Sequence, residues 1–314
     1  MKISIFLPET EFTLEQRKSL ANLGEVVYVK DRSELPLDKI LAMAQGSNII
    51  VPDPDPFGGW EKARPVLMKL IELLPNLKGV CLSSTSFGWI DLDYCKKRNL
   101  SVSNIPGYSR ESVAEHALAL LLCLAKKIIF FDRKTQKGTY KLEMGAELKG
   151  KTLGIIGLGN IGSRLAEMAL GIGMKVIAYN RSPKQMEGVE MKTFDEVLKE
   201  SDAISLHVTH ENSNRGMINK DQIAKMKSGV LMVNLVDRDL VDEIAMAEAL
   251  KSGKVGSYVW EGNDLENTPL AGLENSIGIK EFAYYTKEAL ANLFQIVTDN
   301  VLALAQGNHQ NRVA

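Results

Sequence analysis

A glycine-rich segment in the middle of the chain has residue types and spacing suited to binding a phosphate. It follows an apolar run, opens a helical pattern, and reads Gly157-Leu-Gly159-Asn160-Ile161-Gly162. In such a segment the first glycine permits a tight turn, the second lets the backbone approach a pyrophosphate, and the third lets the helix pack closely. A further apolar run at 175–179 completes the context that this motif needs. The segment predicts a dinucleotide site, the alternative being a glycine turn that binds nothing.

The residues after the run at 175–179 bear on which dinucleotide would bind. They are Asn180, Arg181 and Ser182, and no acidic residue occurs between Lys175 and Met186. A site for NAD usually offers Asp or Glu about 20 residues after the loop, to hold the ribose 2′-hydroxyl. Arg181 and Ser182 could instead bond a 2′-phosphate. We expect NADP, with NAD as the second choice; the alternative is a solvated Arg181.

The elements that position this loop are short β-type runs alternating with helical patterns. In the first hundred residues the expected strands are 2–7, 25–29, 48–51, 79–82 and 100–102, and the expected helices are 15–23, 37–44 and 61–74. A second alternating series runs from Thr152 to about Ile279. The alternation predicts an α/β fold of two Rossmann-like parallel-sheet domains, one flavodoxin-like and one dinucleotide-binding.

Two longer helices and a loop complete the expected organisation. Ser112-Val-Ala-Glu115 fits a capping box, so a long helix is expected to begin at Ser112. Its apolar residues, 117–125, predict burial in a core or subunit interface, where His116 is expected as a satisfied residue. The polar segment 132–149 suits an irregular arm, and a single apolar stripe predicts a last helix over 286–305.

Composition excludes several classes of function. The 314 residues carry a net charge of −1, with 45% hydrophobic and 25% charged residues, which gives no footprint for nucleic acid or an anionic membrane. The N-terminus reads as a strand rather than a signal peptide, and no apolar run is long enough to span a bilayer. The three cysteines are scattered and expected to be buried thiols, which favours a cytoplasmic protein.

Three stretches together resemble the D-isomer-specific 2-hydroxyacid dehydrogenases, the glycerate, phosphoglycerate and glyoxylate group. They are Asn104–Leu120, similar to the family's hinge and long helix; Glu147–Gly162, similar to its nucleotide entry; and Val241-Asp-Glu with Gly253-Lys-Val. The resemblance covers nearly the whole chain. It implies a discontinuous substrate domain, 1–103 plus 285–314, with an NAD(P)-binding Rossmann domain, 104–284, inserted between. It also implies a homodimer formed through the nucleotide domain.

The resemblance also assigns binding residues. The family's substrate loop corresponds to 83–88, which places Thr85 and Ser86 at the substrate unless their hydroxyls simply make the turn. Further cofactor contacts are implied for His207, Val208, Thr209, Asn214, Leu235, Val236 and Trp260. His207 and His210 are close together beside Glu211, but no further ligand cluster is near in sequence, so no metal is expected.

The sequence departs from the family at the residues that carry its chemistry, an Arg that grips the substrate carboxylate and a His–Glu pair that moves the proton. The family's Asn-x-x-Arg-Gly reads here Asn234-Leu-Val-Asp237-Arg238, so that an acid replaces the Arg. Glu281 stands where the family has its His. Trp260 replaces an Asp near the nicotinamide, and Glu266 is the candidate for the relay Glu.

These departures fall on one expected site, which favours a retuned acidic active site. We expect an NAD(P)-dependent oxidoreductase that moves a hydride between nicotinamide and a small carbonyl- or imine-type substrate, with Asp237, Arg238, Glu266 and Glu281 as catalytic residues. Arg238 either pairs with Asp237 and Glu281 or turns to the opposite face, in which case the pocket suits a cationic or amine-bearing ligand. The alternatives are a silent NAD(P)-sensing paralogue and an ordinary 2-hydroxyacid dehydrogenase.

Overall fold

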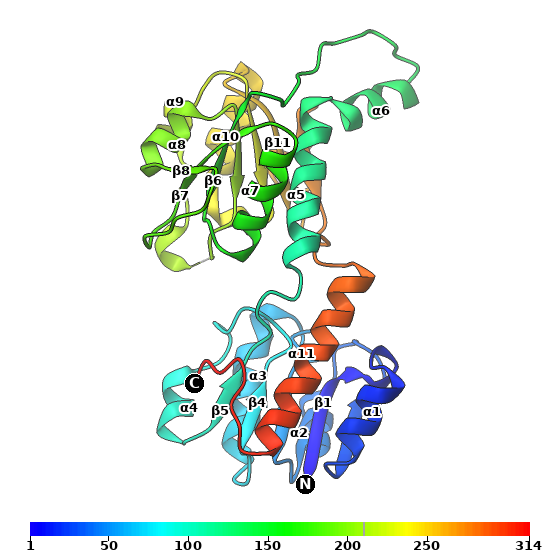
Figure 1. The fold of residues 1–314 in the computed structure, drawn as a ribbon. Helices are drawn as coiled ribbons and strands as arrows, with labels where there is room; N and C mark the ends of the chain where they lie inside the picture. The colour runs from blue at the N-terminus through cyan, green and yellow to red at the C-terminus, as the bar shows by residue number, and fades with distance from the viewer. Residues whose placement is uncertain (210) are drawn as a thin grey trace. The chain divides into compact units, whose positions relative to one another are not determined.

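The computed structural model of the protein describes residues 1–209 and 211–314. The chain divides into two compact units, which we call unit 1 (Met1–Ser109 with Lys287–Ala314) and unit 2 (Arg110–Thr286) (Figure 1). Each unit has its own sheet and its own hydrophobic core. The expected α/β fold of two parallel-sheet domains is therefore confirmed.

Unit 1 is built on a five-stranded parallel sheet in the order β2-β1-β3-β4-β5. This is the flavodoxin-like order. The strands are β1 (Lys2–Pro8), β2 (Glu25–Val29), β3 (Ile49–Val51), β4 (Gly79–Cys81) and β5 (Ser101–Ser103). The helices are α1 (Leu14–Ala21), α2 (Leu37–Ala44), α3 (Trp60–Leu73), α4 (Leu92–Lys97) and α11 (Lys287–Ala305).

The unit boundaries differ by a few residues from those expected. Residues 104–109 belong to unit 1, because their backbone and side chains are bonded there. Asn104 donates from Nδ2 to the carbonyl of Thr85 at 2.8 Å, and its own carbonyl accepts from Asn300 of α11 at 2.8 Å. Ile105 is fully buried in the same core. Residues 285–286, by contrast, belong to unit 2.

Unit 2 is built on a seven-stranded sheet in the order β12-β11-β10-β9-β6-β7-β8, with every pair parallel. The strands are β6 (Thr152–Ile156), β7 (Lys175–Tyr179), β8 (Val189–Met191), β9 (Ala203–Leu206), β10 (Val230–Asn234), β11 (Val255–Glu261) and β12 (Ser276–Ile279). The helices are α5 (Arg110–Ala125), α6 (Ile128–Gln136), α7 (Asn160–Gly171), α8 (Phe194–Glu200), α9 (Lys220–Lys225) and α10 (Glu243–Ser252). The chain reverses its direction of strand addition between β6 and β9, where such sheets bind nucleotides.

The start of α5 corrects one expectation. The helix begins at Arg110, so Ser112 lies inside its first turn and the capping box expected at Ser112 is wrong. The Ser112 hydroxyl instead donates to the carbonyl of Ala283, a residue far away in sequence. The expected irregular arm is also partly wrong, because α6 continues to Gln136 and only residues 137–151 lack regular structure. Among the described residues no helix is long and apolar enough to cross a membrane.

Candidate cofactor site and acidic pocket

The glycine loop of unit 2 has the close approaches that a phosphate cradle requires. Gly157 has a φ of +100°, and a Cβ placed there would lie 2.5 Å from the carbonyl carbon of His207. A Cβ on Gly162 would lie 2.1 Å from the Gly157 oxygen, whereas one on Gly159 would meet nothing within 4 Å. The first and third glycines are thus needed by the fold, and the second leaves its face open. This arrangement, at the N-terminus of α7, fits a pyrophosphate.

The residues expected to bind the cofactor follow the carboxyl ends of neighbouring strands. Gly157 follows β6, Asn180 follows β7, His207 follows β9 and Leu235 follows β10. Because the sheet is wholly parallel, these ends lie along one edge, which is where open α/β sheets bind their ligands. Asn160 and Ile161 open α7, with the Ile161 side chain half-buried on the core.

The turn after β7 is bonded to the glycine loop. Asn180 Oδ1 accepts from the Leu158 amide at 3.0 Å, and Asn180 Nδ2 donates to the carbonyl of Ser182 at 2.8 Å. Lys184, which was not expected in this site, donates from Nζ to the Leu158 carbonyl and, at 3.1 Å, to Ser163 Oγ. The loop therefore has an ammonium group beside it, and no local sequence pattern marks this lysine.

Arg181, the residue expected to bind a 2′-phosphate, is held by a carboxylate. Its Nη1 and Nη2 donate to the two carboxylate oxygens of Glu211 at 3.0 and 3.3 Å. The Arg181 side chain is 78% exposed, so the pair lies in solvent. The bond from Arg181 lowers the pKa of Glu211. A phosphate at this position would compete with Glu211 for the guanidinium.

The loop after β9 uses most of its polar groups internally. His207 Nε2 and Ser205 Oγ are 2.8 Å apart, and burial lowers the pKa of His207 to about 4, so the imidazole is neutral. Asn214 donates to the carbonyl of Thr209 at 2.7 Å and accepts from the Glu211 amide. Val208 packs on the core. His210 lies outside the described residues, among which no group of three His, Cys, Asp or Glu side chains could hold a metal.

The loop after β10 is shaped by one buried amide. Asn234 Nδ2 donates to the carbonyl of Asp237 at 2.8 Å, and Asn234 Oδ1 accepts from the amide of Val236 at 3.1 Å. Leu235 and Val236 are half-buried on the core beneath. Asp237 then caps a short 3-10 helix (Arg238–Leu240) by accepting from the Asp239 amide at 2.8 Å.

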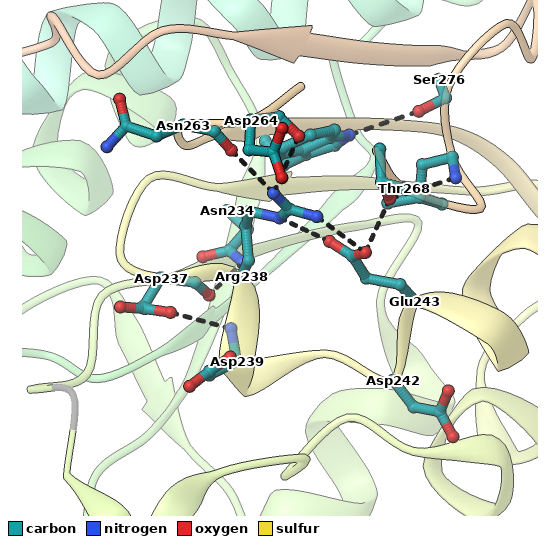
Figure 2. A network of polar contacts seen from close by, with 12 residues as sticks. Asn234, Asp237, Arg238, Asp239, Asp242, Glu243, Asn263, Asp264, Thr268 and Ser276 are labelled. Atoms are coloured by element: carbon teal, nitrogen blue, oxygen red, sulfur yellow. Dashed lines mark hydrogen bonds and ion pairs between the residues drawn. The ribbon is translucent and has the colours of Figure 1, made fainter. Parts of the chain in front are cut away.

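Arg238 is committed to a structural network (Figure 2). Its Nε and Nη2 donate to the two carboxylate oxygens of Glu243 at 2.7 and 2.9 Å. Its Nη1 donates to the carbonyls of Asn263 and Asp264 at 2.7 and 3.2 Å. The guanidinium lies 4.8 Å from the centre of the Trp260 ring. In Figure 2 the Asp237 carboxylate points away from this guanidinium, so Arg238 bridges α10 to the 263–264 loop.

Trp260 is a core residue at this position, although it was expected at the cofactor. Its side chain is 1% exposed, and its Nε1 donates to Ser276 Oγ at 3.3 Å. The ring needs a glycine at position 278, because a Cβ there would lie 2.7 Å from it, and Arg238 needs one at position 262, where a Cβ would lie 2.6 Å from Arg238 Cδ. The guanidinium of Arg238 packs against this buried ring.

Asp237 and Glu281 line one hollow of unit 2. This acidic pocket, of about 470 Å³, is lined by Asp237, Arg238, Asp239, Val241, Glu243, Gly262, Asn263 and Glu281. It places one arginine among four carboxylates. Burial, with the nearby carboxylates of Glu261 and Asp237, raises the pKa of Glu281. Glu281 and Glu266 are both exposed residues, but Glu266 does not line this pocket.

Two further groups behind Glu281 were not expected in the site. Glu261, at the end of β11, is 6% exposed, and its Oε1 accepts from the amides of Phe282 and Ala283 at 3.2 and 3.0 Å. His116 of α5 places Nε2 3.4 Å from the same oxygen. Glu261 could have been found from sequence, because it is the only charged residue of its strand and stands at the strand's end. No local pattern connects it with His116.

Unit 1 contains the loop expected to bind substrate. The Thr85 hydroxyl donates to the carbonyl of Ile105 at 3.1 Å, so it holds the turn, while Ser86 is exposed and its carbonyl accepts from Trp89. Beside this loop Asp53, 5% exposed, accepts from Ser83 Oγ at 2.7 Å and lies 3.5 Å from Arg32. Burial raises the pKa of Asp53 to about 6.

Comparison with known proteins places this geometry in a family. Residues 118–278 match the model described as D-isomer specific 2-hydroxyacid dehydrogenase, NAD binding domain. A D-3-phosphoglycerate dehydrogenase of Archaeoglobus fulgidus is 35% identical over 76% of this chain, a match that spans 47% of that protein. A hydroxypyruvate reductase of Blautia hydrogenotrophica is 30% identical over 94% of both chains.

A solved structure extends the likeness to the whole fold. It is that of an acyclic imino acid reductase in complex with NADPH and D-Arg, which is 25% identical, covers 100% of both chains and superposes with a TM-score of 0.86. The order of strands in both sheets, the glycine loop and these matches all indicate the same family. The chain belongs to the D-isomer-specific 2-hydroxyacid dehydrogenase family, a family of NAD-dependent oxidoreductases, and unit 2 carries its NAD-binding domain.

Proposed function

We propose that the protein transfers a hydride between a bound nicotinamide and a small imine- or carbonyl-type substrate, and that it does so at the acidic pocket. The observation that carries this proposal is the placement of Asp237 and Glu281 in one hollow while Arg238 is bonded to Glu243. The cation that would hold a keto acid's carboxylate is therefore replaced by negative charge. Such a pocket favours a substrate that carries an amine or an iminium nitrogen.

Each carboxyl group has a distinct part in this proposal. Asp237 attracts and orients the cationic nitrogen. The environment of Glu281 raises its pKa, and in this proposal its carboxyl group is the general acid that donates a proton to the nitrogen or oxygen being reduced. The reduced nicotinamide, when bound, supplies the hydride to the carbon of the double bond. Hydride plus proton converts an imine to an amine or a carbonyl to an alcohol, and solvent returns the proton to Glu281.

The comparison with the acyclic imino acid reductase supports both the substrate class and the cofactor. That protein was solved with NADPH and with D-Arg, a ligand that bears cationic nitrogen. In this chain the segment 180–186 after β7 carries Arg181, Ser182 and Lys184 and no acidic residue, and the Glu211 carboxylate that lies near it is bonded to Arg181. NADPH is accordingly the cofactor we propose, with NADH as the weaker one.

Keto acid reduction is a second candidate function. It is favoured by the names of the curated relatives, which include hydroxypyruvate reductases and glyoxylate reductases. A cation other than Arg238 would have to hold the substrate carboxylate, because that guanidinium is bonded to Glu243, Asn263 and Asp264.

A cytoplasmic homodimer completes the proposal. The arm after α6 carries Tyr140, Leu142 and Met144 with most of each side chain exposed in the single chain. Large apolar side chains on an arm of the nucleotide unit fit burial against a second copy. The free cysteines, two of them buried, fit a reducing compartment.

The deciding experiment compares substrates with and without an amine. The protein is mixed with NADPH and pyruvate, glyoxylate or hydroxypyruvate, each alone and together with methylamine, and the loss of NADPH absorbance is followed. We expect oxidation that depends on the amine. Oxidation with the keto acid alone at an equal rate would establish the second candidate, and no oxidation with any pair would favour a nucleotide-sensing protein.

Two variants and a control then test the pocket. Glu281→Gln should reduce the amine-dependent rate by about 10²–10⁴, because it removes the general acid. Asp237→Asn should reduce this rate by less, because it removes the group that orients the substrate. NADPH affinity should stay nearly unchanged in both. Glu248→Gln is the matched control, because Glu248 is an exposed acid of α10 that does not line the pocket, and it should retain the wild-type rate.

A further inference from the structure

Glu261 is a buried carboxylate that holds the backbone next to Glu281. Its Oε1 accepts from the amides of Phe282 and Ala283 at 3.2 and 3.0 Å, and these are the two residues that follow Glu281. With only 6% of the residue exposed, Glu261 has almost no water to solvate its charge. A buried charge is tolerated only where hydrogen bonds and an opposite charge compensate it. The two amides supply part of this compensation.

His116 is the polar side chain that faces the same carboxylate oxygen. Its Nε2 lies 3.4 Å from Glu261 Oε1, and that nitrogen is otherwise a buried atom without a hydrogen-bond partner in the described chain. The imidazole also packs edge-on against the Phe282 ring, with centroids 4.8 Å apart. One turn earlier on α5, Ser112 donates to the carbonyl of Ala283. Helix α5 and strand β11 thus hold residues 282–283 from two sides.

The charges around Glu281 come from several elements. Glu261 of β11 and Asp237 of the loop after β10 are negative, and Lys280 beside it is positive. Asp239, Glu243 and Arg238 line the same pocket, with Arg238 bonded to Glu243. Negative neighbours disfavour ionisation of a carboxyl group, and a positive neighbour favours it. Glu261 is the negative neighbour that does not line the acidic pocket.

We propose that Glu261 and His116 form a positioning pair for Glu281. Glu261 fixes the backbone that carries Glu281 and disfavours ionisation of its carboxyl group, while the imidazole holds the Glu261 carboxylate in place. Neither group lines the acidic pocket, so both act through Glu281. The use of the Glu281 proton rests on the proposed function, but the pairing itself can be tested without a substrate.

The test is a pH titration of the Glu281 carboxyl carbon by NMR in protein labelled with ¹³C-glutamate, the signal being assigned from its loss in Glu281→Gln. Glu261→Gln removes the negative charge and retains an acceptor oxygen, so the pKa of Glu281 should fall. His116→Gln removes the imidazole that faces Glu261, so the pKa of Glu281 should rise. Glu115→Gln, an exposed acid next to His116 on α5, should leave the titration unchanged.

Opposite shifts are the signature of the pair. A purely structural role would move both variants in the same direction, and that outcome, or no shift in either, overturns the proposal. If His116→Gln does not fold, His116→Asn takes its place. The titration is independent of turnover: opposite shifts without amine-dependent NADPH oxidation would retain the pair and reject the proposed function. Amine-dependent oxidation with both pKa shifts in one direction would retain the proposed function and reject the pair.

Discussion

The glycine loop allows a sharp test of the nucleotide site, because its three glycines have different surroundings. A Cβ on Gly159 would meet no atom within 4 Å, and the residue has a φ of −75° that alanine adopts freely. Gly159→Ala should therefore fold normally. The new methyl group would stand where the pyrophosphate approaches. Overpacking of this kind costs about 1–3 kcal/mol, which is about 5- to 150-fold in Kd.

Gly162 gives the opposite expectation. A Cβ there would lie 2.1 Å from the backbone oxygen of Gly157, which cannot move without distorting the turn. Gly162→Ala should lower the free energy of unfolding by about 1–3 kcal/mol, with a Tm several degrees lower. Gly171→Ala, at the open C-terminal end of the same helix, is the control and should be neutral or stabilising by about 0.5–1 kcal/mol.

The assay is a titration of each variant with NADPH, followed by fluorescence, beside a thermal melt without nucleotide. The expected pattern is weak binding with a normal melt for Gly159→Ala, and a low melt for Gly162→Ala. Wild-type affinity in Gly159→Ala would refute the reasoning, because it would mean that the pyrophosphate does not lie against that residue.

Two further predictions concern charged groups. Arg181→Ala should remove most of the preference for NADPH over NADH, whereas Glu211→Gln, which frees the guanidinium, should tighten NADPH and leave NADH unchanged; equal Kd values for both cofactors in the wild type would contradict this. The second concerns pH: since the folded-state pKa of Asp53 is raised to about 6, folded protein binds the extra proton, and stability should fall as pH rises from about 4 to about 6. Asp53→Asn should lack this part of the pH dependence in urea melts, and an unchanged slope would show that Asp53 does not titrate there.

The parts of the molecule that could be predicted from sequence are those set by local pattern. The bounds of β2 and α2 are as expected, because both are set by the pattern of apolar residues within the element and by the turn residues next to it. The glycine loop is equally local, since its turn and its close packing need glycine at fixed spacing. Asp237 and Glu281 were expected at one site through the family pattern, and the structure brings them into one pocket.

The parts that sequence could not supply depend on distant partners. Ser112 looks like a helix cap, but its hydroxyl bonds to Ala283, 171 residues away. The direction of Arg238 was open between pairing with Asp237 and Glu281 and turning away, and its actual partner, Glu243, depends on where α10 begins in space. His116 and Glu261 are 145 positions apart in the chain, so only the packing of α5 on β11 makes them neighbours.

The network around Trp260 constrains the order in which this site can evolve. The indole needs the bare backbones of Gly262 and Gly278, and it supports the guanidinium that is bonded to Glu243. Replacing Trp260 with a small acid would open a cavity beneath Arg238 and place a second carboxylate beside that pair. A side chain at Gly278, conversely, would clash while the tryptophan remains, and one at Gly262 would clash while Arg238 keeps its place. These positions are therefore epistatic: a lineage moving between the acidic site and the family's ordinary one must change several of them together, and a single reversion at Asp237 would restore the residue without restoring its surroundings.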